Sequence, residues 1–216
     1  MASGLKVIIL MLLRRLRNGI KMTEEQGLDL WFPTSVYWAR NILSKEENEK
    51  LKQVSLDIKE KHASTTKDWK CNVISTFGTF NPWSDETFSL LLERMSNHVH
   101  RFAQLHNSFE KYYTNVAWLN FNDKEHYQEF HTHNSYIVSA IYYITAPEGS
   151  APTTFKTIHD DMLPMKNITK CNELSTRYIH YQAEEGKLLL FRSNIPHLVP
   201  QGTNNDIRIT LSANFR

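Results

Sequence analysis

Residues 129–144, EFHTHNSYIVSAIYYI, join an H-x-H pair to a long run of β-branched and aromatic residues. Such residues favour strands, and a continuous apolar run is typical of a strand that is buried on both faces. On a strand, residues i and i+2 project from the same face, so His131 and His133 are predicted to lie side by side. Glu129 is expected one step earlier on that face. The stretch predicts a buried strand with two imidazoles directly before it.

The sequence after Tyr113 alternates between short β-forming runs and turns. The runs are TNVAWLNF, HYQEFHTH, YIVSAIYYIT, TTFKTI, TRYIHYQA, KLLLF and IRITLSANF. Turn-forming residues separate them, most clearly at 147–149, 185–186, 195–196 and 201–202. This many short strands with regular turns favours a jelly roll or a barrel-like double sheet.

Two amphipathic helices are predicted before these strands. Ser44 and Glu47 form a capping-box pattern, and the helix that they begin is expected to continue to about His62. A second, longer helix is predicted to start at Ser84 or Asp85. Its apolar stripe consists of Phe88, Leu91, Met95, Val99, Phe102 and Leu105. The stretch LDLWFPTSVYWAR, at 28–40, predicts an earlier strand with a bend, and the order of helices before strands indicates an α+β fold.

Length and charge indicate one domain with a short basic extension. A chain of 216 residues has room for one substantial core. Residues 1–21 hold five basic residues and no acid, which leaves 20 basic residues against 23 acidic ones, a charge of −3, in the rest. We predict that 1–21 lie outside the fold and that 22–216 form a single domain. The mildly acidic body gives no indication of nucleic-acid binding.

The N-terminal segment and the cysteines indicate where in the cell the protein is expected. The apolar run 7–13 is far shorter than the roughly 20 residues that a membrane span requires, so no membrane span is predicted. Two interpretations of residues 1–21 stay open. They could form a cationic amphipathic helix that binds a membrane surface, or they could precede the true translation start at Met22. Cys71 and Cys171 stand 100 positions apart in no metal-binding spacing, which fits buried free thiols in a reducing compartment. We predict the cytoplasm, or the host cytoplasm if the protein is viral.

His131 and His133 can bind one metal ion together, and His197 is the best candidate for a third ligand. His197 lies in FRSNIPHLV, where a strand is expected to end in a turn constrained by proline. Three protein ligands with open positions are typical of a catalytic rather than a structural metal site. Among ten histidines, however, an H-x-H pair also arises by chance on a solvent-facing strand. The spacing alone leaves the metal site and the solvated pair both open.

Arg208 favours the metal site. The sequence DIRITLSANF places Arg208, Thr210, Ser212 and Asn214 on one face of a strand and apolar residues on the other. A guanidinium on the polar face of an inner strand can hold a carboxylate by two parallel hydrogen bonds. A metal with open positions beside an anchored carboxylate suggests a bound keto acid.

At these residues the chain resembles the 2-oxoglutarate- and Fe(II)-dependent dioxygenases, in particular a small branch of oxygenases common in phage and marine bacterial genomes. The matching segments appear in the family's order from about Leu30 to the C-terminus. They are LWFPTSVYWAR, HTHNSYIVSAIYYI, PEGSAPTTF, EEGKLLLFRSNIPHLVP and RITLSANF. The resemblance implies a double-stranded β-helix (jelly roll) with the N-terminal helices packed on one sheet.

The resemblance also assigns roles to single residues. The metal ligands of the family correspond to His131, His133 and His197, which are then also the catalytic residues. Its arginine for the distal carboxylate of 2-oxoglutarate corresponds to Arg208. Tyr143 matches a position from which related hydroxylases add a phenol hydrogen bond to that carboxylate. On the face of Arg208, Ser212 and Asn214 are expected to support the site from outside the ligand set.

One position departs from the family pattern. The usual facial triad has two histidines and one carboxylate, whereas His133 stands at the carboxylate position here. Three histidines still bind Fe(II), although the loss of an anion leaves the iron more positive. Glu129, Asp160 or Asp161 are the alternative sources of a carboxylate, and zinc remains open as the metal.

The resemblance implies a non-haem Fe(II) and 2-oxoglutarate-dependent dioxygenase that hydroxylates its substrate and releases succinate and CO2. Its partners are O2 and a small-molecule or protein side-chain substrate. Two alternatives stay open: a jelly-roll binding module with or without a metal, and a cupin-like three-histidine dioxygenase that does not use 2-oxoglutarate. The sequence identifies neither the substrate nor the oligomeric state.

Overall fold

The computed structural model describes residues 33–65, 71–114, 116–158, 169–173 and 175–216. Residues from Thr34 to Arg216 form one compact unit. The boundary predicted between residues 21 and 22 lies outside the described residues and stays a prediction. In the described part of the chain, no helix has the length and apolar character needed to cross a membrane.

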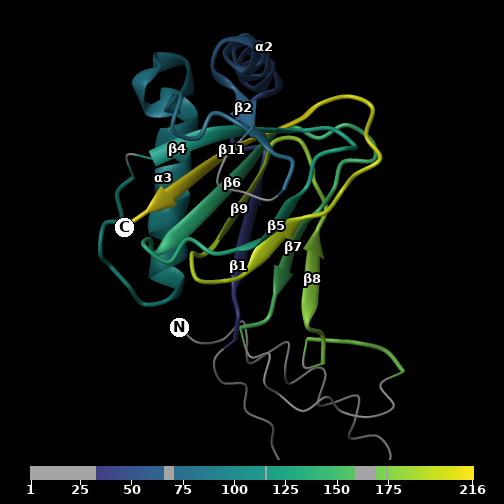
Figure 1. Ribbon diagram of the computed structural model, residues 1–216. Helices are drawn as coiled ribbons and strands as arrows, with labels where there is room; N and C mark the ends of the chain where they lie inside the picture. Colours follow the sequence, from purple (N-terminus) through teal and green to yellow (C-terminus); the bar gives the residue numbers. More distant parts are fainter. Residues whose placement is uncertain (1–32, 66–70, 115, 159–168, 174) are drawn as a thin grey trace, which may run out of the picture. The chain divides into compact units, whose positions relative to one another are not determined.

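Two antiparallel sheets carry the fold (Figure 1). The larger sheet has the order β1-β9-β6-β11-β4-β3-β2 and the smaller sheet the order β5-β10-β7-β8. In that order the strands of the larger sheet are Val36–Arg40, Lys187–Arg192, Val138–Thr145, Arg208–Phe215, Val116–Asn122, Ile74–Ser75 and Ser64–Thr65. Those of the smaller sheet are Gln128–His131, His197–Val199, Thr153–Lys156 and Tyr178–Tyr181. The predicted jelly roll is confirmed, and each predicted strand that lies wholly in the described residues is present.

Helices α2 (Lys45–His62) and α3 (Ser89–Leu105) pack on one face of the larger sheet. Helix α2 begins and ends as predicted. The predicted start of α3 at Ser84 or Asp85 is wrong, because the 3-10 turns η1 (Pro82–Ser84) and η2 (Glu86–Phe88) come first. Asn81 and Asp85 cap these turns by accepting hydrogen bonds from Trp83 N and Thr87 N. Asp85 is therefore a cap, but of a shorter element than the one predicted.

The alternation of β11 divides its residues between the two faces of the larger sheet. The apolar set packs into the core beneath the helices, while the polar set lines a pocket between the two sheets. The apolar set is Ile209, Leu211, Ala213 and Phe215, and the polar set is Arg208, Thr210, Ser212 and Asn214. A strand that is buried on both faces thus places a row of polar side chains along an interior pocket.

The capping box at the start of α2 permits a stability test. Ser44 N donates to Glu47 Oε2 at 2.7 Å, and Glu47 N donates to Ser44 Oγ at 3.2 Å. We expect Ser44→Ala to lower the free energy of unfolding by about 1 kcal/mol, because it leaves the Glu47 amide without its acceptor. Urea denaturation measures this loss, and Ser44→Asp, which keeps an acceptor oxygen, should remain close to the wild type. Equal stability of Ser44→Ala and the wild type would contradict the prediction.

Candidate metal and carboxylate site

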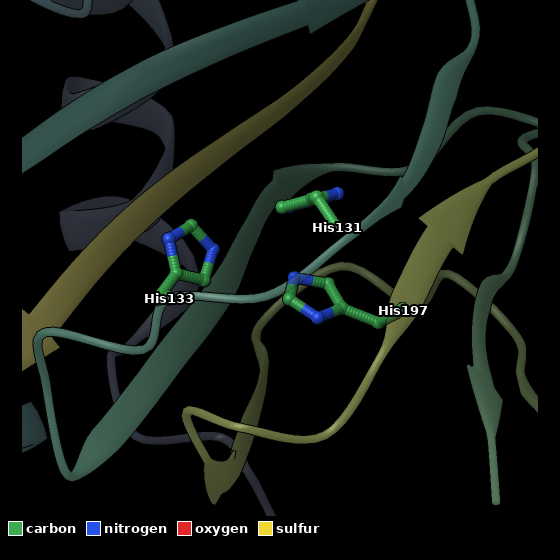
Figure 2. A group of neighbouring side chains, drawn as sticks. All are labelled: His131, His133 and His197. Atoms are coloured by element: carbon green, nitrogen blue, oxygen red, sulfur yellow. The ribbon is translucent and has the colours of Figure 1, made fainter. Parts of the chain in front are cut away.

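Three histidines meet at one end of the smaller sheet (Figure 2). His131 is the last residue of β5 and His197 the first of β10, and the two are direct partners in the ladder between these strands. His133 lies two residues beyond the end of β5, so the prediction that it shares a strand with His131 is wrong. Its backbone N–H donates to Ser193 O at 2.8 Å, which anchors the segment after the strand. The strand pairing therefore places two imidazoles, and a turn contact helps to place the third.

The three rings are close enough to share one ion. One ligand atom from each residue lies within 4.8 Å of the other two. The ring centroids are 4.1 Å apart for His131 and His197, 5.0 Å for His131 and His133, and 5.3 Å for His133 and His197. Among the described residues, this is the group of histidine, cysteine and acidic side chains with metal-binding geometry.

The carboxylates considered as alternative ligands do not join this group where they are described. Glu129 is exposed, and its backbone carbonyl, rather than its carboxylate, contacts the site by accepting a hydrogen bond from His131 Nδ1 at 2.8 Å. Asp160 and Asp161 lie outside the described residues. The described part of the cluster is a neutral three-nitrogen face.

Backbone carbonyls orient two of the rings. His131 Nδ1 donates to Glu129 O, and His197 Nδ1 donates to Ile195 O at 3.0 Å. A carbonyl can only accept, so Nδ1 carries the proton in both rings and Nε2 carries the lone pair. This is the tautomer that a metal-binding histidine adopts when its other nitrogen is fixed by a hydrogen bond.

Burial keeps the three imidazoles uncharged. Loss of solvent lowers the pKa of His131, brings the pKa of His133 to about 4, and holds the pKa of His197 well below its usual value. The charge of neighbouring imidazoles further lowers the pKa of His133 and His197. A metal ion binds the neutral ring, so no positive charge on these imidazoles opposes a metal ion at neutral pH.

Arg208 lies on the same pocket in an unusual state for a guanidinium. It is 2% exposed, and its Nη1 donates to Asn122 Oδ1 at 3.1 Å. Within the described residues, its Nε has no hydrogen-bond partner and no carboxylate forms an ion pair with it. Burial lowers its pKa, but arginine remains charged in proteins. A buried cation with an unused donor fits an anionic ligand.

The aromatic ring of Tyr143 packs against the guanidinium of Arg208. The Arg208 Cζ atom lies 5.1 Å from the centroid of the Tyr143 ring, within the range of a cation–π contact. The phenol oxygen is 2.6 Å from Thr153 Oγ1. The structure thus places Tyr143 beside Arg208 with its hydroxyl turned to Thr153, and the predicted hydrogen bond to a ligand stays a prediction.

The pocket that joins the histidines to Arg208 is lined mainly by polar side chains. Its described lining contains no aspartate or glutamate. Besides the three histidines, Asn122 and the polar residues of β11, the lining consists of Asn120, Gln128, Ser139, Trp118, Ala140, Ile141, Phe191 and Val199. Tyr143 is not part of this lining. Sequence reasoning missed the asparagines of β4, although their alternation with Leu119 and Phe121 was a usable signal. The chemistry of these side chains suits a divalent metal at the histidines and a carboxylate at Arg208.

Comparison with known proteins gives a family and a fold. Residues 116–214 match a family described as "Putative 2OG-Fe(II) oxygenase". A comparison with curated protein sequences finds no match. A prolyl-4-hydroxylase from Pseudomonas putida is similar in structure, with a TM-score of 0.61 and 13% identity over 85% of this chain and 92% of that one.

Two further solved structures share the fold. The viral collagen prolyl hydroxylase from Paramecium Bursaria Chlorella virus-1, solved with 2OG, has a TM-score of 0.55 and 14% identity over 84% of this chain and 95% of that one. The α-ketoglutarate-dependent carbocyclase SnoK from nogalamycin biosynthesis has a TM-score of 0.61 and 10% identity over 84% and 79%. At these identities the likeness shows the fold. The family match confirms the resemblance and, at the level of the family, the prediction of Fe(II) and 2-oxoglutarate as cofactors.

Proposed function

We propose, from the match of residues 116–214 to the family described as "Putative 2OG-Fe(II) oxygenase", that the chain is a 2-oxoglutarate- and Fe(II)-dependent oxygenase that hydroxylates a C–H bond of its substrate. One oxygen atom of O2 enters the new hydroxyl group and the other enters succinate, while 2-oxoglutarate loses CO2. The family match does not favour either a binding module or a cupin-like enzyme without 2-oxoglutarate.

The three histidines are proposed to hold the metal and to act as the catalytic ligand set. Iron, when bound, supplies the activation of O2 and the oxidation of the substrate. The chain supplies three neutral imidazoles, and backbone carbonyls fix the orientation of two of them, His131 and His197, before the metal binds. Because no anion of the described chain joins the set, the metal would keep its full positive charge for the carboxylate of a bound keto acid.

Arg208 is proposed to bind the carboxylate of 2-oxoglutarate that is remote from the metal. Its Nε has no partner among the described residues, and Asn122 holds its Nη1 in place. The Tyr143 ring packs against the face of the guanidinium and limits its movement. The pairing of a carboxylate with this buried cation would be strong, because little water competes there.

The observation that carries the proposal is the placement of two complementary sites on one pocket. Three neutral imidazoles within 4.8 Å of one another suit a divalent metal, and a buried guanidinium with an unused donor suits a carboxylate. Either feature alone is compatible with a purely structural role. A keto acid that chelates a metal and extends to a second carboxylate uses both.

The similar structures and the cysteines bear on the substrate and the compartment. Three of the similar structures are prolyl hydroxylases, which supports a protein side chain as substrate, and SnoK is a carbocyclase of nogalamycin biosynthesis, which supports a small molecule. Cys71 and Cys171 are both free thiols, which supports the proposed cytoplasmic location; Cys71 is buried as predicted, whereas the prediction that Cys171 is buried is wrong, because its side chain is exposed.

The direct test uses the wild-type protein without a known substrate. Under anaerobic conditions, 2-oxoglutarate is titrated calorimetrically into protein loaded with Fe(II), and succinate is then measured after air and ascorbate are added. We expect saturable binding, and slow succinate formation that requires Fe(II), 2-oxoglutarate and O2 together. Absence of metal-dependent 2-oxoglutarate binding would refute the proposal.

A further inference from the structure

A buried hydrogen-bonded chain leads from His133 into the larger sheet. Asn214 Nδ2 lies 3.3 Å from His133 Nδ1, and Asn214 Oδ1 accepts a hydrogen bond from Ser139 Oγ at 2.7 Å. Ser139 Oγ in turn lies 2.9 Å from Ser193 Oγ. Asn214 and Ser139 are direct partners on β11 and β6, and all three polar side chains are 3% exposed or less. The chain is therefore a built part of the interior that ends on one proposed ligand.

This chain holds His133 in a different tautomer from the other two histidines. An amide nitrogen only donates, so His133 Nδ1 accepts from Asn214 and the proton of the neutral ring is on Nε2. In His131 and His197 the proton is on Nδ1. Figure 2 shows one nitrogen of His133 directed toward His197 and the other directed away from it. The nitrogen opposite Nδ1 thus carries a proton where a metal needs a lone pair.

We propose that Asn214 is the positioning residue that brings His133 into its metal-binding tautomer. A rotation of its carboxamide by about 180° exchanges the oxygen and the nitrogen, so that Oδ1 accepts from His133 Nδ1–H. The proton leaves Nε2, and that nitrogen becomes available to the metal. The inference rests on the metal site of the proposed function and adds a residue that acts through His133.

The serines allow this rotation without the loss of a hydrogen bond. After it, Asn214 Nδ2 donates to Ser139 Oγ, and Ser139 donates to Ser193 in place of receiving a proton from it. Hydroxyl groups can reverse in this way because each is both donor and acceptor. A carboxylate at position 214 could accept from His133 but could not donate to Ser139, whereas an apolar side chain could do neither.

His133 depends on such a partner more than the other ligands do. It lies beyond the end of β5, so no strand ladder fixes it, and its backbone N–H donates to the carbonyl of Ser193. Ser193 is therefore linked to His133 in two ways. Its carbonyl accepts from the backbone N–H of His133, and its hydroxyl is the last group of the hydrogen-bonded chain that reaches the His133 ring. An outer hydrogen-bond partner of this kind orients a ligand and raises its basicity.

The test measures Co(II) binding by absorption spectroscopy, without 2-oxoglutarate and without turnover. We expect Asn214→Leu to weaken Co(II) binding by about 10- to 100-fold. Asn214→Asp restores an acceptor for His133 Nδ1–H and should return the affinity to within about 3-fold of the wild type. Asn120→Leu is the matched control, because Asn120 lines the same pocket but bonds to Ser212 and, within the described chain, to no histidine. Its affinity should not change.

His197→Ala separates the role of Asn214 from the metal site itself. If it binds Co(II) as tightly as the wild type, the metal site is refuted. If it loses Co(II) while Asn214→Leu does not, the role of Asn214 is overturned and the site stands.

The wild-type protein provides a second measurement in case Asn214→Leu does not fold. Long-range ¹H–¹⁵N spectra should show the His133 proton on Nε2 without metal and on Nδ1 with Zn(II). The same tautomer in both states would overturn the inference.

Discussion

Replacing His197 by alanine will abolish metal-dependent activity and weaken Fe(II) binding by on the order of 100-fold or more. His197 is central to the cluster, since its ring is 3% exposed and lies close to both other histidines. Loss of an outer partner of a ligand already costs about 10- to 100-fold in metal affinity, so loss of one of three ligands should cost at least as much. Anaerobic Fe(II) titration and succinate formation measure the two effects.

The control must account for the packing role of His197. Its ring centroid lies 4.7 Å from that of Phe191 and 6.0 Å from that of Phe155, so alanine also removes core contacts. His180→Ala removes an imidazole from β8 of the same sheet, where His180 bonds to Thr154 and lies outside the cluster. It should bind Fe(II) like the wild type. Unchanged Fe(II) affinity in a folded His197→Ala protein would show that the imidazoles converge without binding metal.

Local patterns in the sequence predicted most of the fold. The Ser44 capping box, the alternation of β11 and the turns between strands each depend on residues that are close in the chain, and each is present in the structure. The start of α3 was wrong because Asp85 has the same capping chemistry for a 3-10 turn as for a helix. Local chemistry identifies such a boundary but not which type of turn follows it.

The site needed information that no local pattern contains. The H-x-H spacing indicated a pair, but His133 is held by Ser193, 60 residues later, and not by the strand of His131. The Tyr143 hydroxyl meets Thr153 because β6 and β7 contribute to the same interior, which a strand pattern cannot show. The sequence indicated the three histidines and Arg208 because their types are chemically distinctive, and the structure places them on one pocket. Their hydrogen-bond partners depend on how the two sheets pack together.

Replacing Arg208 by methionine will weaken 2-oxoglutarate binding while the metal site remains intact. Removal of one partner of a buried, hydrogen-bonded charge pair costs about 2–5 kcal/mol, which corresponds to an increase in Kd of roughly 30- to 4000-fold. Fe(II) affinity should stay within about 3-fold of the wild type, because Arg208 does not belong to the ligand cluster. Calorimetric titration of 2-oxoglutarate into the Fe(II)-loaded protein measures the first effect, and anaerobic Fe(II) titration measures the second.

The same substitution should leave the ligand-free protein as stable as the wild type, or more stable. Arg208 is a buried charge whose Nε has no partner in the described residues, and an apolar side chain of similar length removes that cost. A melting temperature that does not fall, combined with lost 2-oxoglutarate affinity, distinguishes a ligand-binding role from a structural one.

Two further variants define what Arg208 contributes. Arg208→Lys keeps the charge without the planar fork, so its 2-oxoglutarate affinity should lie between those of the wild type and Arg208→Met. Arg192→Met removes an exposed guanidinium at the end of β9, outside the pocket, and should change neither affinity nor activity. Wild-type 2-oxoglutarate affinity in Arg208→Met would mean that the buried guanidinium serves the fold alone, because a carboxylate held by this pocket has no other cation in the described lining.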